Sequence, residues 1–522
     1  MKKLLVWTLC FCMLLGSTAF AEVLGEYPVT TQPVTFTAWA IQPNSSMVDN
    51  FNENPAYQEL ERITGVHIEW ENVSSEGSAE KRALRLAQGD LPDLFFRGAM
   101  SDDEVATLAS TGQLVDLADL LDENAPNFMA LVEKDPSIMA KIMDGSGHVY
   151  SLPQIATPSH TSHLILNIKW LENLGLEMPT TRDEYYEVLK AFKEQDANGN
   201  GNPDDEIPLS AVGLNGFTDL MNSFGVYIGN YYGMFVYPGN TNVECSYITD
   251  NMKEALAWLK KLYDEGLMDP ESFSQNGDTY TVKGTSNTLG SLRVAGAFVN
   301  VGNDLHFDYR GLPPFPDQNG NQLVNKRYAA EGNQFCITSN CSDPALALRW
   351  VDYLYSEAGT TLVWLGVKGV SWEWKDAEKT TWRWIKPDDM TMQQFRHSYA
   401  IQGGTGYPAA HPIWFESSMW DRQEDPIEAS LDTDLFRKPN TDCSVVLWPP
   451  IKWTLEQSEE LGFILPDCST YFTSSAVDFI TGVRDIDAEW DSYVNTMKDM
   501  GIEKAIAICQ DAYDAYQAKL TK

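Results

Sequence analysis

The sequence predicts an α/β protein of two domains or lobes, each with a mainly parallel sheet flanked by helices. Three observations lead to this fold class. The chain has 522 residues, more than a single domain usually holds. Segments with strand and helix periodicity alternate between residues 34 and 96, and a second alternation starts near residue 147. Such alternation favours a parallel sheet with helices on both faces.

The first alternation contains three strands and two helices. Residues 34–41 (VTFTAWAI) alternate like a strand, and a helix over residues 79–90 is stopped by Gly89. In chain order, the five elements occupy residues 34–41, 54–65, 66–73, 79–90 and 91–96. Ligands of such sheets bind beyond the carboxyl ends of the strands. Those ends place Trp39, Asn44 and Arg97 among the candidate ligand contacts.

The second alternation begins after the segment GHVYSLP at residues 147–153, where we expect the first crossing between lobes. A strand at 164–168 is followed by a short helix and then by a longer one, which begins at a capping box of Thr181 and Glu184. One apolar stripe of that helix is predicted to be core, and it contains Tyr185, Val188, Leu189 and Phe192.

That longer helix leads into DANGNGNPDDE, residues 196–206, which begins like a calcium-binding EF-hand loop. Ile207 stands where an EF-hand places its bidentate Glu, and no second helix follows in register. We therefore expect a static calcium site, the alternative being a polar turn without metal. The candidate ligands are Asp196, Asn198, Asn200, Asn202, Asp204, Asp205 and Glu206.

The first 21 residues have a basic start, an apolar run and an A-x-A ending, which is typical of a cleaved secretory signal. Cys10 and Cys12 lie within the run, and neither follows the small residues of a lipoprotein processing site, so we predict no lipid anchor. The formal charge of −37 argues against nucleic-acid partners, because such a chain repels phosphate backbones. Six cysteines remain after cleavage, of which Cys336 and Cys341 are close enough in sequence for a local disulfide, the alternative being buried free thiols.

Common catalytic motifs are absent: there is no H-E-x-x-H, G-x-S-x-G, P-loop or G-x-G-x-x-G. His160 and His163 are close in sequence but lack a third ligand for zinc, so we place them in a polar loop. His160, just past the first crossing, is nevertheless a candidate ligand contact. A glycoside hydrolase stays open as an alternative, because the 74 acidic residues allow many carboxylate pairs.

Tryptophans are the remaining signal. SWEW and TWRW predict a β-hairpin within residues 370–384 that places four indoles on one face, either packed on the body or exposed for stacking. Indoles stack well on sugar rings. Trp414 and Trp420, which follow the hairpin, are the last two candidate ligand contacts. Trp448 and Trp453 come later in the chain.

These features occur within segments that resemble the extracellular solute-binding proteins of bacterial ABC importers. The resemblance is strongest to the carbohydrate-binding group that includes the LplA-like lipoproteins and the alginate-binding proteins. The segments are LAQGDLPDLFF, GQLVDLADLLDENAPN, GHVYSLP, residues 169–209, residues 352–374 and residues 476–516. The resemblance implies a two-lobed, periplasmic-binding-protein-like fold of type II with ligand held between the lobes. It also implies a structural calcium loop. The family loop has Asp-Glu where this chain has Asp204 and Asp205, with Glu206 one place later, so which two bind stays open.

We therefore expect a non-enzymatic, monomeric, exported protein, extracellular, surface-associated or periplasmic, that delivers a saccharide to an ABC permease. The alternatives are the hydrolase named above and a receptor for a peptide or other small solute on the same scaffold. The expected organisation is a signal peptide at 1–21, lobe 1 at 22–153, lobe 2 at 154–305, a return to lobe 1 at 306–430, and a C-terminal part at 431–522 made mainly of lobe 2 helices.

Overall fold

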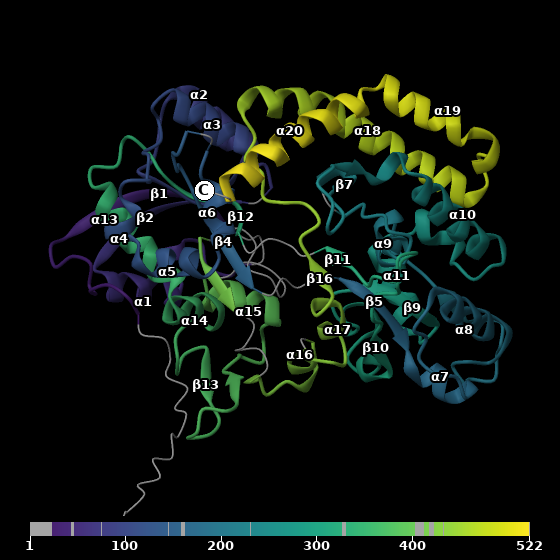
Figure 1. The fold of residues 1–522 in the computed structure, drawn as a ribbon. Coiled ribbons are helices and arrows are strands. Elements are labelled where there is room, and N and C mark those ends of the chain that lie inside the picture. Colours follow the sequence, from purple (N-terminus) through teal and green to yellow (C-terminus); the bar gives the residue numbers. More distant parts are fainter. Residues whose placement is uncertain are drawn as a thin grey trace, which may run out of the picture.

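The computed structural model shows two lobes side by side, with three C-terminal helices running along one edge of both (Figure 1). It describes residues 23–42, 46–74, 76–144, 146–157, 162–229, 231–325, 330–401, 412–416, 422–431 and 433–520. Each lobe contains one main sheet with its own hydrophobic core. The two-lobed α/β architecture agrees with the sequence prediction. The expectation of a mainly parallel sheet in each lobe is wrong for lobe 2, because two of the three strand pairings of its sheet are antiparallel.

The sheet of lobe 1 has six strands in the order β15-β4-β12-β3-β1-β2. Their bounds are β1 Val34–Gln42, β2 Val66–Ser74, β3 Leu94–Met100, β4 Leu152–Thr157, β12 Ala330–Ile337 and β15 Trp414–Glu416. β1 pairs in parallel with β2 and β3, and β15 pairs in parallel with β4. β12 lies antiparallel between β3 and β4.

Helices cover both faces of this sheet because alternate residues of β1 and β3 point to opposite sides. Phe36 and Phe96 face one core, which α1, α5 and α13 complete, and Trp39 and Phe95 face a smaller core beneath α3. The helices of this lobe are α1 Pro55–Thr64, α2 Ser78–Gln88, α3 Asp102–Ser110, α4 Leu121–Asn124, α5 Pro126–Lys134, α6 Ser137–Ile142, α13 Pro344–Asp352, α14 Glu357–Leu365 and α15 Met392–Tyr399.

Lobe 2 has a four-stranded sheet in the order β10-β5-β9-β6, in which only β6 and β9 pair in parallel. Its strands are β5 His163–Asn167, β6 Ile207–Leu209, β9 Leu289–Val294 and β10 Tyr309–Gly311. Its helices are α7 Ile168–Leu174, α8 Arg182–Glu194, α9 Thr218–Asn222, α10 Asp250–Asp264, α11 Gly277–Thr285, α12 Phe298–Val301, α16 Pro426–Ser430 and α17 Lys438–Thr441. Two-stranded ribbons pair β7 Met234–Phe235 with β8 Glu244–Cys245 and β11 Val324–Asn325 with β16 Ser444–Val445.

The C-terminal arm consists of α18 Leu455–Thr481, α19 Ile486–Asp499 and α20 Ile502–Leu520. Its apolar faces belong to the core of lobe 2, as Leu465, Trp490 and Cys509 show. In Figure 1 the arm crosses above both lobes, and α20 ends near the lobe 1 helices.

The sheets place one lobe boundary later than the sequence rhythm suggested. We expected lobe 2 to end at residue 305, but β10 pairs with β5 and therefore still belongs to lobe 2. The chain re-enters lobe 1 only with β12. The strand pairing explains the difference, because β10 lies at the edge of the sheet and is too short to give a periodic signal.

The tryptophan hairpin forms as expected and packs on lobe 1. β13 (Trp372–Trp374) and β14 (Trp382–Trp384) are antiparallel, with Trp372 opposite Trp384. Trp382 is fully buried and shares a cluster with Trp364 and Leu365 of α14. The structure thus gives the hairpin a packing role.

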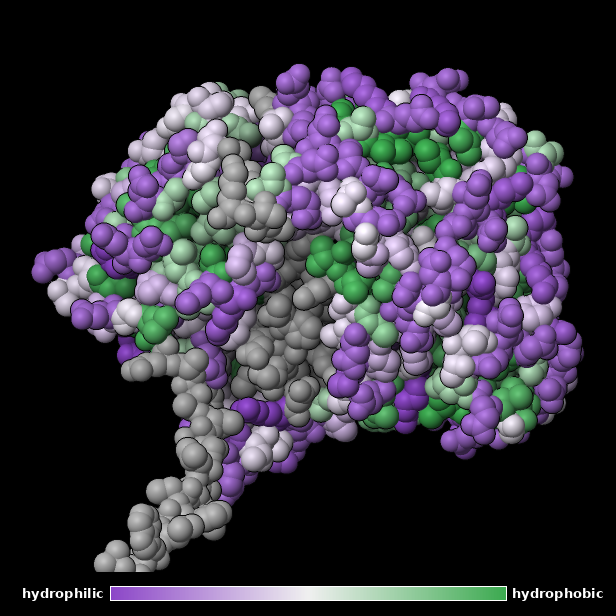
Figure 2. Space-filling model, viewed as in Figure 1, coloured by the Kyte–Doolittle hydropathy of each residue, from purple (hydrophilic) through white to green (hydrophobic). Residues whose placement is uncertain are grey.

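The six cysteines from Cys245 onward are free thiols. Cys336 and Cys341 lie in lobe 1 cores, whereas Cys245, Cys468 and Cys509 share the core of lobe 2. Hydrophilic residues dominate the face shown in Figure 2, as the acidic composition leads one to expect. Among the described residues, none of the helices combines the length and apolar character that crossing a bilayer requires.

Candidate functional site: a cavity between the lobes

The cleft edge of lobe 1 is set by its parallel strands. β1, β3, β4 and β15 run in the same direction, so their carboxyl ends meet at one edge of the sheet, where ligands of such sheets bind. The N-terminus of α3 follows directly after β3 at this edge. Asn44, His160 and Trp420 follow β1, β4 and β15 in sequence and lie outside the described residues.

A cavity of about 360 Å³ opens between this edge and lobe 2. Lobe 1 contributes Asp102 and Asp103 of α3 and Lys141 of α6. Lobe 2 contributes an aromatic wall, which consists of Tyr231, Tyr232, Trp448 and Trp453. This volume lies at the lower end of the range typical of small-molecule sites.

The aromatic wall is a packed cluster of rings. Tyr231 lies nearly parallel to Trp448, at 6.2 Å between centroids and 9° between planes. Trp453 approaches Tyr231 at 5.0 Å and Trp448 at 6.4 Å. Trp448 is 7% exposed, whereas Tyr231 and Trp453 are half-buried and border the cavity. Half-buried rings whose positions are fixed by neighbours can stack on a sugar at a low cost in conformational entropy.

Burial of Tyr231 raises the pKa of its hydroxyl, so the ring is neutral at physiological pH. The wall therefore offers apolar ring faces and neutral donors. Among the described residues that line the cavity, only Asp102, Asp103 and Lys141 are charged. Such a surface suits a polyhydroxylated, uncharged ligand.

The Asp102 carboxylate accepts hydrogen bonds from two side chains. Its Oδ1 accepts hydrogen bonds from Lys452 Nζ at 2.6 Å and from Asn333 Nδ2 at 2.9 Å. Asn333 also donates to the Met100 carbonyl and accepts from Ser151, so it is tied to β3 and to the residue before β4. Burial opposes ionisation of Asp102, but Lys452, Lys141 and Asn333 outweigh it and hold its pKa below the usual value.

Three candidate contacts predicted from the sequence can be placed, and each lies mainly within lobe 1. Trp39 is 1% exposed, with Phe95 at 5.9 Å and the Arg82 guanidinium 5.5 Å from its ring centroid. Trp39 thus packs in the lobe 1 core, because a strand residue that faces α3 points away from the edge of the sheet. Arg97 and Trp414 remain predictions as ligand contacts.

Arg97 is 4% exposed and adopts a left-handed backbone conformation, with φ 54°. Its guanidinium lies 5.9 Å from the Phe51 ring centroid, and its Nε has no hydrogen-bond partner among the described residues. Trp414 is half-buried against the lobe 1 core, with Lys134 of α5 5.8 Å from its ring.

The cavity residues escaped the sequence prediction because they are far apart in the chain. Tyr231 and Trp453 meet across more than two hundred residues, and neither follows a main strand. One feature of the sequence could have indicated the aromatic wall. The segment WPPIKW (residues 448–453) carries two tryptophans on a short, proline-stiffened stretch, which is unusual for a helix or a strand.

The loop at residues 196–206 curls around its own polar groups. Asp196 accepts from the Gly201 N–H at 2.9 Å, and Glu206 accepts from the Asn198 N–H at 3.2 Å. Asp205 accepts from the side-chain amides of Asn198 and Asn200, at 3.0 and 2.8 Å. Asn202 and Asp204 lie on the exposed part of the loop.

Two buried carboxylate oxygens of this loop, Asp196 Oδ1 and Glu206 Oε2, have no hydrogen-bond partner among the described residues. Glu206 is only 3% exposed. An unpaired buried carboxylate is costly, and hard oxygen ligands suit calcium, so the donor set fits this cation. No three His, Cys, Asp or Glu side chains converge as a metal site in the described part of the chain, so amide and backbone oxygens would complete the set.

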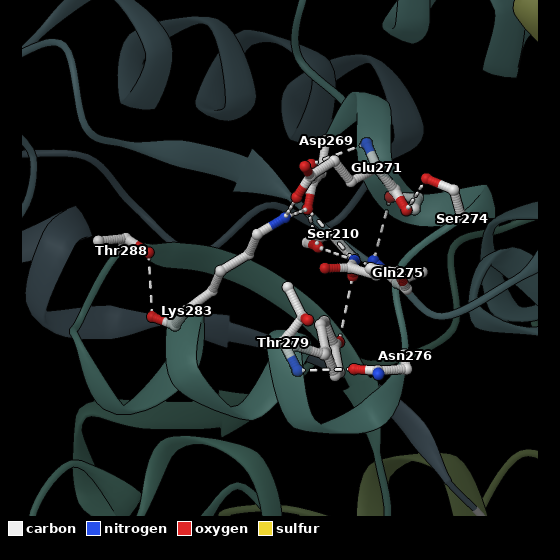
Figure 3. Close-up of polar contacts among 12 residues, drawn as sticks. Ser210, Asp269, Glu271, Ser274, Gln275, Asn276, Thr279, Lys283 and Thr288 are labelled. Carbon is white, nitrogen blue, oxygen red and sulfur yellow. Dashed lines mark hydrogen bonds and ion pairs between the residues drawn. The ribbon is translucent and has the colours of Figure 1, made fainter.

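A polar network anchors the strand that follows this loop (Figure 3). Asp269, of which the side chain is 3% exposed, accepts from Lys283 at 2.7 Å and from Ser210 at 2.6 Å. Gln275 donates to the hydroxyl of Ser210, the residue after β6, at 3.0 Å. Asp269 therefore fastens Lys283 of α11 to Ser210 at the end of β6, and Lys283 also pairs with Glu271 at 2.7 Å.

Two α/β lobes that enclose an aromatic cavity define a solute-binding protein of the hinged, two-lobed class. Residues 45–361 match the model of the bacterial extracellular solute-binding protein family. This match covers more than half of the chain, and the protein therefore belongs to that family.

Among curated relatives, the fructooligosaccharide ABC transporter substrate-binding protein FusA of Streptococcus pneumoniae serotype 4 is 28% identical over 485 residues, 90% of this chain and 88% of FusA. Its structure with kestose has a TM-score of 0.72 at 27% identity, covering 93% of this chain and 100% of that one. A FusA EF-hand mutant in complex with fructo-nystose gives the same values. A solute-binding protein of Bifidobacterium longum infantis, associated with an HMO-binding ABC transporter, has a TM-score of 0.78 at 22% identity and covers 93% and 99%.

Proposed function

We propose that this protein captures an oligosaccharide in the cavity between its lobes and delivers it to the permease of an ABC importer. A fructooligosaccharide is the first ligand to test. The observation that carries the proposal is the aromatic wall of Tyr231, Trp448 and Trp453 opposite the N-terminus of α3. The likeness to FusA over nine-tenths of the chain supports the same class of ligand.

Isothermal titration calorimetry with kestose, and with maltotriose as a glucose-based comparison, tests this function. We expect the wild type to bind kestose and Trp453→Ala to bind it more weakly. A lost stacking contact should cost about 1–3 kcal/mol, or roughly 5- to 150-fold in Kd. Trp374→Ala is the matched control, because that indole belongs to the hairpin and does not line the cavity. If the wild type binds neither sugar, the assignment of an oligosaccharide loses its support.

We further propose that the loop at residues 196–206 holds a structural calcium ion. Asp196 and Glu206 would contribute the buried oxygens that lack a partner, and Asn198, Asn200 and Asp205 line the same turn. The description of a FusA structure as an EF-hand mutant supports a loop of this kind in a relative. The ion would supply charge balance and loop rigidity, with no part in chemistry on the solute.

The protein is proposed to act without catalysis, as an exported monomer whose signal peptide ends at Ala21. Incubation with kestose followed by an assay for released fructose tests the absence of hydrolysis. Release of fructose at a rate that scales with protein concentration would favour the hydrolase alternative.

A further inference from the structure

The start of α3 is fastened to the segment that leads into the C-terminal arm. Lys452 Nζ donates to Asp102 at 2.6 Å, and Ser458 in the first turn of α18 donates to the neighbouring Asp103. Two adjacent acidic residues of lobe 1 therefore bind two residues of the same segment, which comes from lobe 2. Asp102 also accepts a hydrogen bond from Asn333 of β12, which keeps the carboxylate fixed within lobe 1.

Lys452 lies directly before Trp453 and four residues after Trp448 in sequence, and these two indoles belong to the aromatic wall of the cavity. Its side chain is 12% exposed, and that of Asp102 is 29% exposed. Water screens this pair less than the exposed ion pairs at the protein surface. The two prolines between Trp448 and Lys452 stiffen the segment, so the position of the ammonium group helps to fix that of the Trp453 indole.

A second and larger cavity lies on the other side of this bridge. Its volume is about 880 Å³, and it lies between α3, α6 and the end of α20. Asp102, Asp103, Ile451, Trp453 and Ser458 border both cavities. Trp453 borders open space on both sides, and its ring neighbours in the wall are Tyr231 and Trp448. The tether at Lys452 adds to these contacts in fixing the position of the indole.

We propose that Asp102 and Lys452 are a positioning pair that holds Trp453 in the orientation required to stack on the bound solute. The proposal rests on the function proposed above and adds a role for an interlobe ion pair. An indole that is ordered before binding loses less conformational entropy when the ligand arrives, which raises affinity without a direct contact from the pair. The same bridge fixes where the arm meets lobe 1, and so limits the positions that the two lobes can adopt.

The first test follows the environment of the Trp453 indole in the protein without any sugar. The protein is labelled with 5-fluorotryptophan, and the fluorine resonance of Trp453 is assigned by its disappearance in Trp453→Phe. We expect this resonance to shift and broaden in Lys452→Met and in Asp102→Asn. Lys253→Met is the matched control, because its partner Asp487 lies within the C-terminal arm, at 3.1 Å. An unchanged Trp453 resonance in Lys452→Met would overturn the proposal, whatever the protein binds.

The second test uses kestose and calorimetry. Lys452→Met should weaken binding at least 10-fold, Lys452→Arg should recover much of that loss because the charge returns, and Lys253→Met should bind like the wild type. Melting temperatures within a few degrees of the wild type exclude a folding defect. Equal kestose affinity for Lys452→Met and the wild type would refute the positioning role, whereas failure of the wild type to bind kestose would count against the proposed ligand and leave the fluorine result to decide.

Discussion

Asp269 is a buried carboxylate that depends on Lys283 for charge compensation. Lys283→Met keeps the apolar stem but leaves the carboxylate with hydrogen bonds alone. Removing one partner of a buried pair is strongly destabilising, so we expect the free energy of unfolding to fall by about 3 kcal/mol. Urea denaturation measures this fall. Lys169→Met removes an exposed pair with Glu172 and should change stability by less than about 1 kcal/mol. Equal losses in the two variants would show that the Lys283–Asp269 pair stabilises the protein no more than an exposed ion pair does.

His306 should make stability depend on pH. Its Nδ1 accepts from the Phe298 N–H at 3.2 Å, Nε2 lies 3.0 Å from the Ser430 hydroxyl, and burial and Arg310 lower its pKa to about 4. The unfolded histidine titrates near 6.5, so between these values the unfolded state binds more protons. The contribution of neutral His306 to the free energy of unfolding is therefore fully present above pH 6.5 and is lost as the pH falls towards 4. It amounts to about 3 kcal/mol at most.

Denaturation of the wild type and of His306→Gln at pH 7.5, 6 and 5 checks this expectation. The variant should lose less stability than the wild type as the pH falls. His67→Gln, which alters an exposed histidine, should follow the wild type. Parallel losses in all three proteins would assign the acid sensitivity to other groups.

Sequence reasoning at this scale succeeds where a residue's role follows from its own helix. Tyr185, Val188, Leu189 and Phe192 are buried as their spacing predicts, because one stripe of α8 must face the core. It fails for Tyr231, Trp448 and Trp453, since their association depends on how distant segments cross. Trp39 shows the opposite limit, because a position near the end of a strand does not reveal to which face the ring points.

Among the elements, the loop at residues 196–206 carries the clearest prediction. If it binds calcium, added Ca²⁺ should raise the melting temperature, and a chelator should lower it, because an ion that binds only the folded state stabilises that state. Asp196→Ala combined with Asn200→Ala should melt lower than the wild type and no longer respond to chelator. Scanning fluorimetry with and without EDTA is sufficient. Identical wild-type curves in the two conditions would refute a structural ion.

Most elements of the first alternation lie within a few residues of their predicted positions. β1, α1 and β2 have strong local signals, namely alternation, a proline at the helix start and a glycine at its end. The start of α8 is more subtle. Thr181 caps the helix as expected, but Glu184 accepts from Thr180 and not from Thr181, so the reciprocal half of the capping box is displaced by one residue. Sequence patterns locate a cap without fixing its partner.

At the scale of the whole molecule, two lobes around a cavity predict closure on the ligand. Small-angle scattering should give a smaller radius of gyration with saturating kestose than without, because lobes that close on a solute expel water from between them. Maltotriose serves as the control if calorimetry shows that it does not bind. An unchanged radius at saturation would mean that the lobes are already closed when empty.

The order of the strands could not be read from the sequence. β12 enters the lobe 1 sheet between β3 and β4 after an excursion of more than 150 residues through lobe 2, and it runs against both neighbours. A rhythm of strands and helices predicts the class of fold. It does not indicate which later strand fills a gap left by earlier ones, because that depends on pairing across the whole chain.

The buried thiols are distributed so that each lobe contains at least one whose rate of alkylation reports local opening. A thiol that burial keeps protonated reacts with an alkylating reagent only when its surroundings open. Cys336 would therefore report openings of lobe 1, and Cys245 and Cys509 those of lobe 2. Mass spectrometry after timed alkylation could measure the opening of both lobes in one sample, without introducing any new cysteine. A bound solute that slowed both equally would show that the lobes share one cooperative unit, whereas unequal slowing would show which lobe it stabilises more.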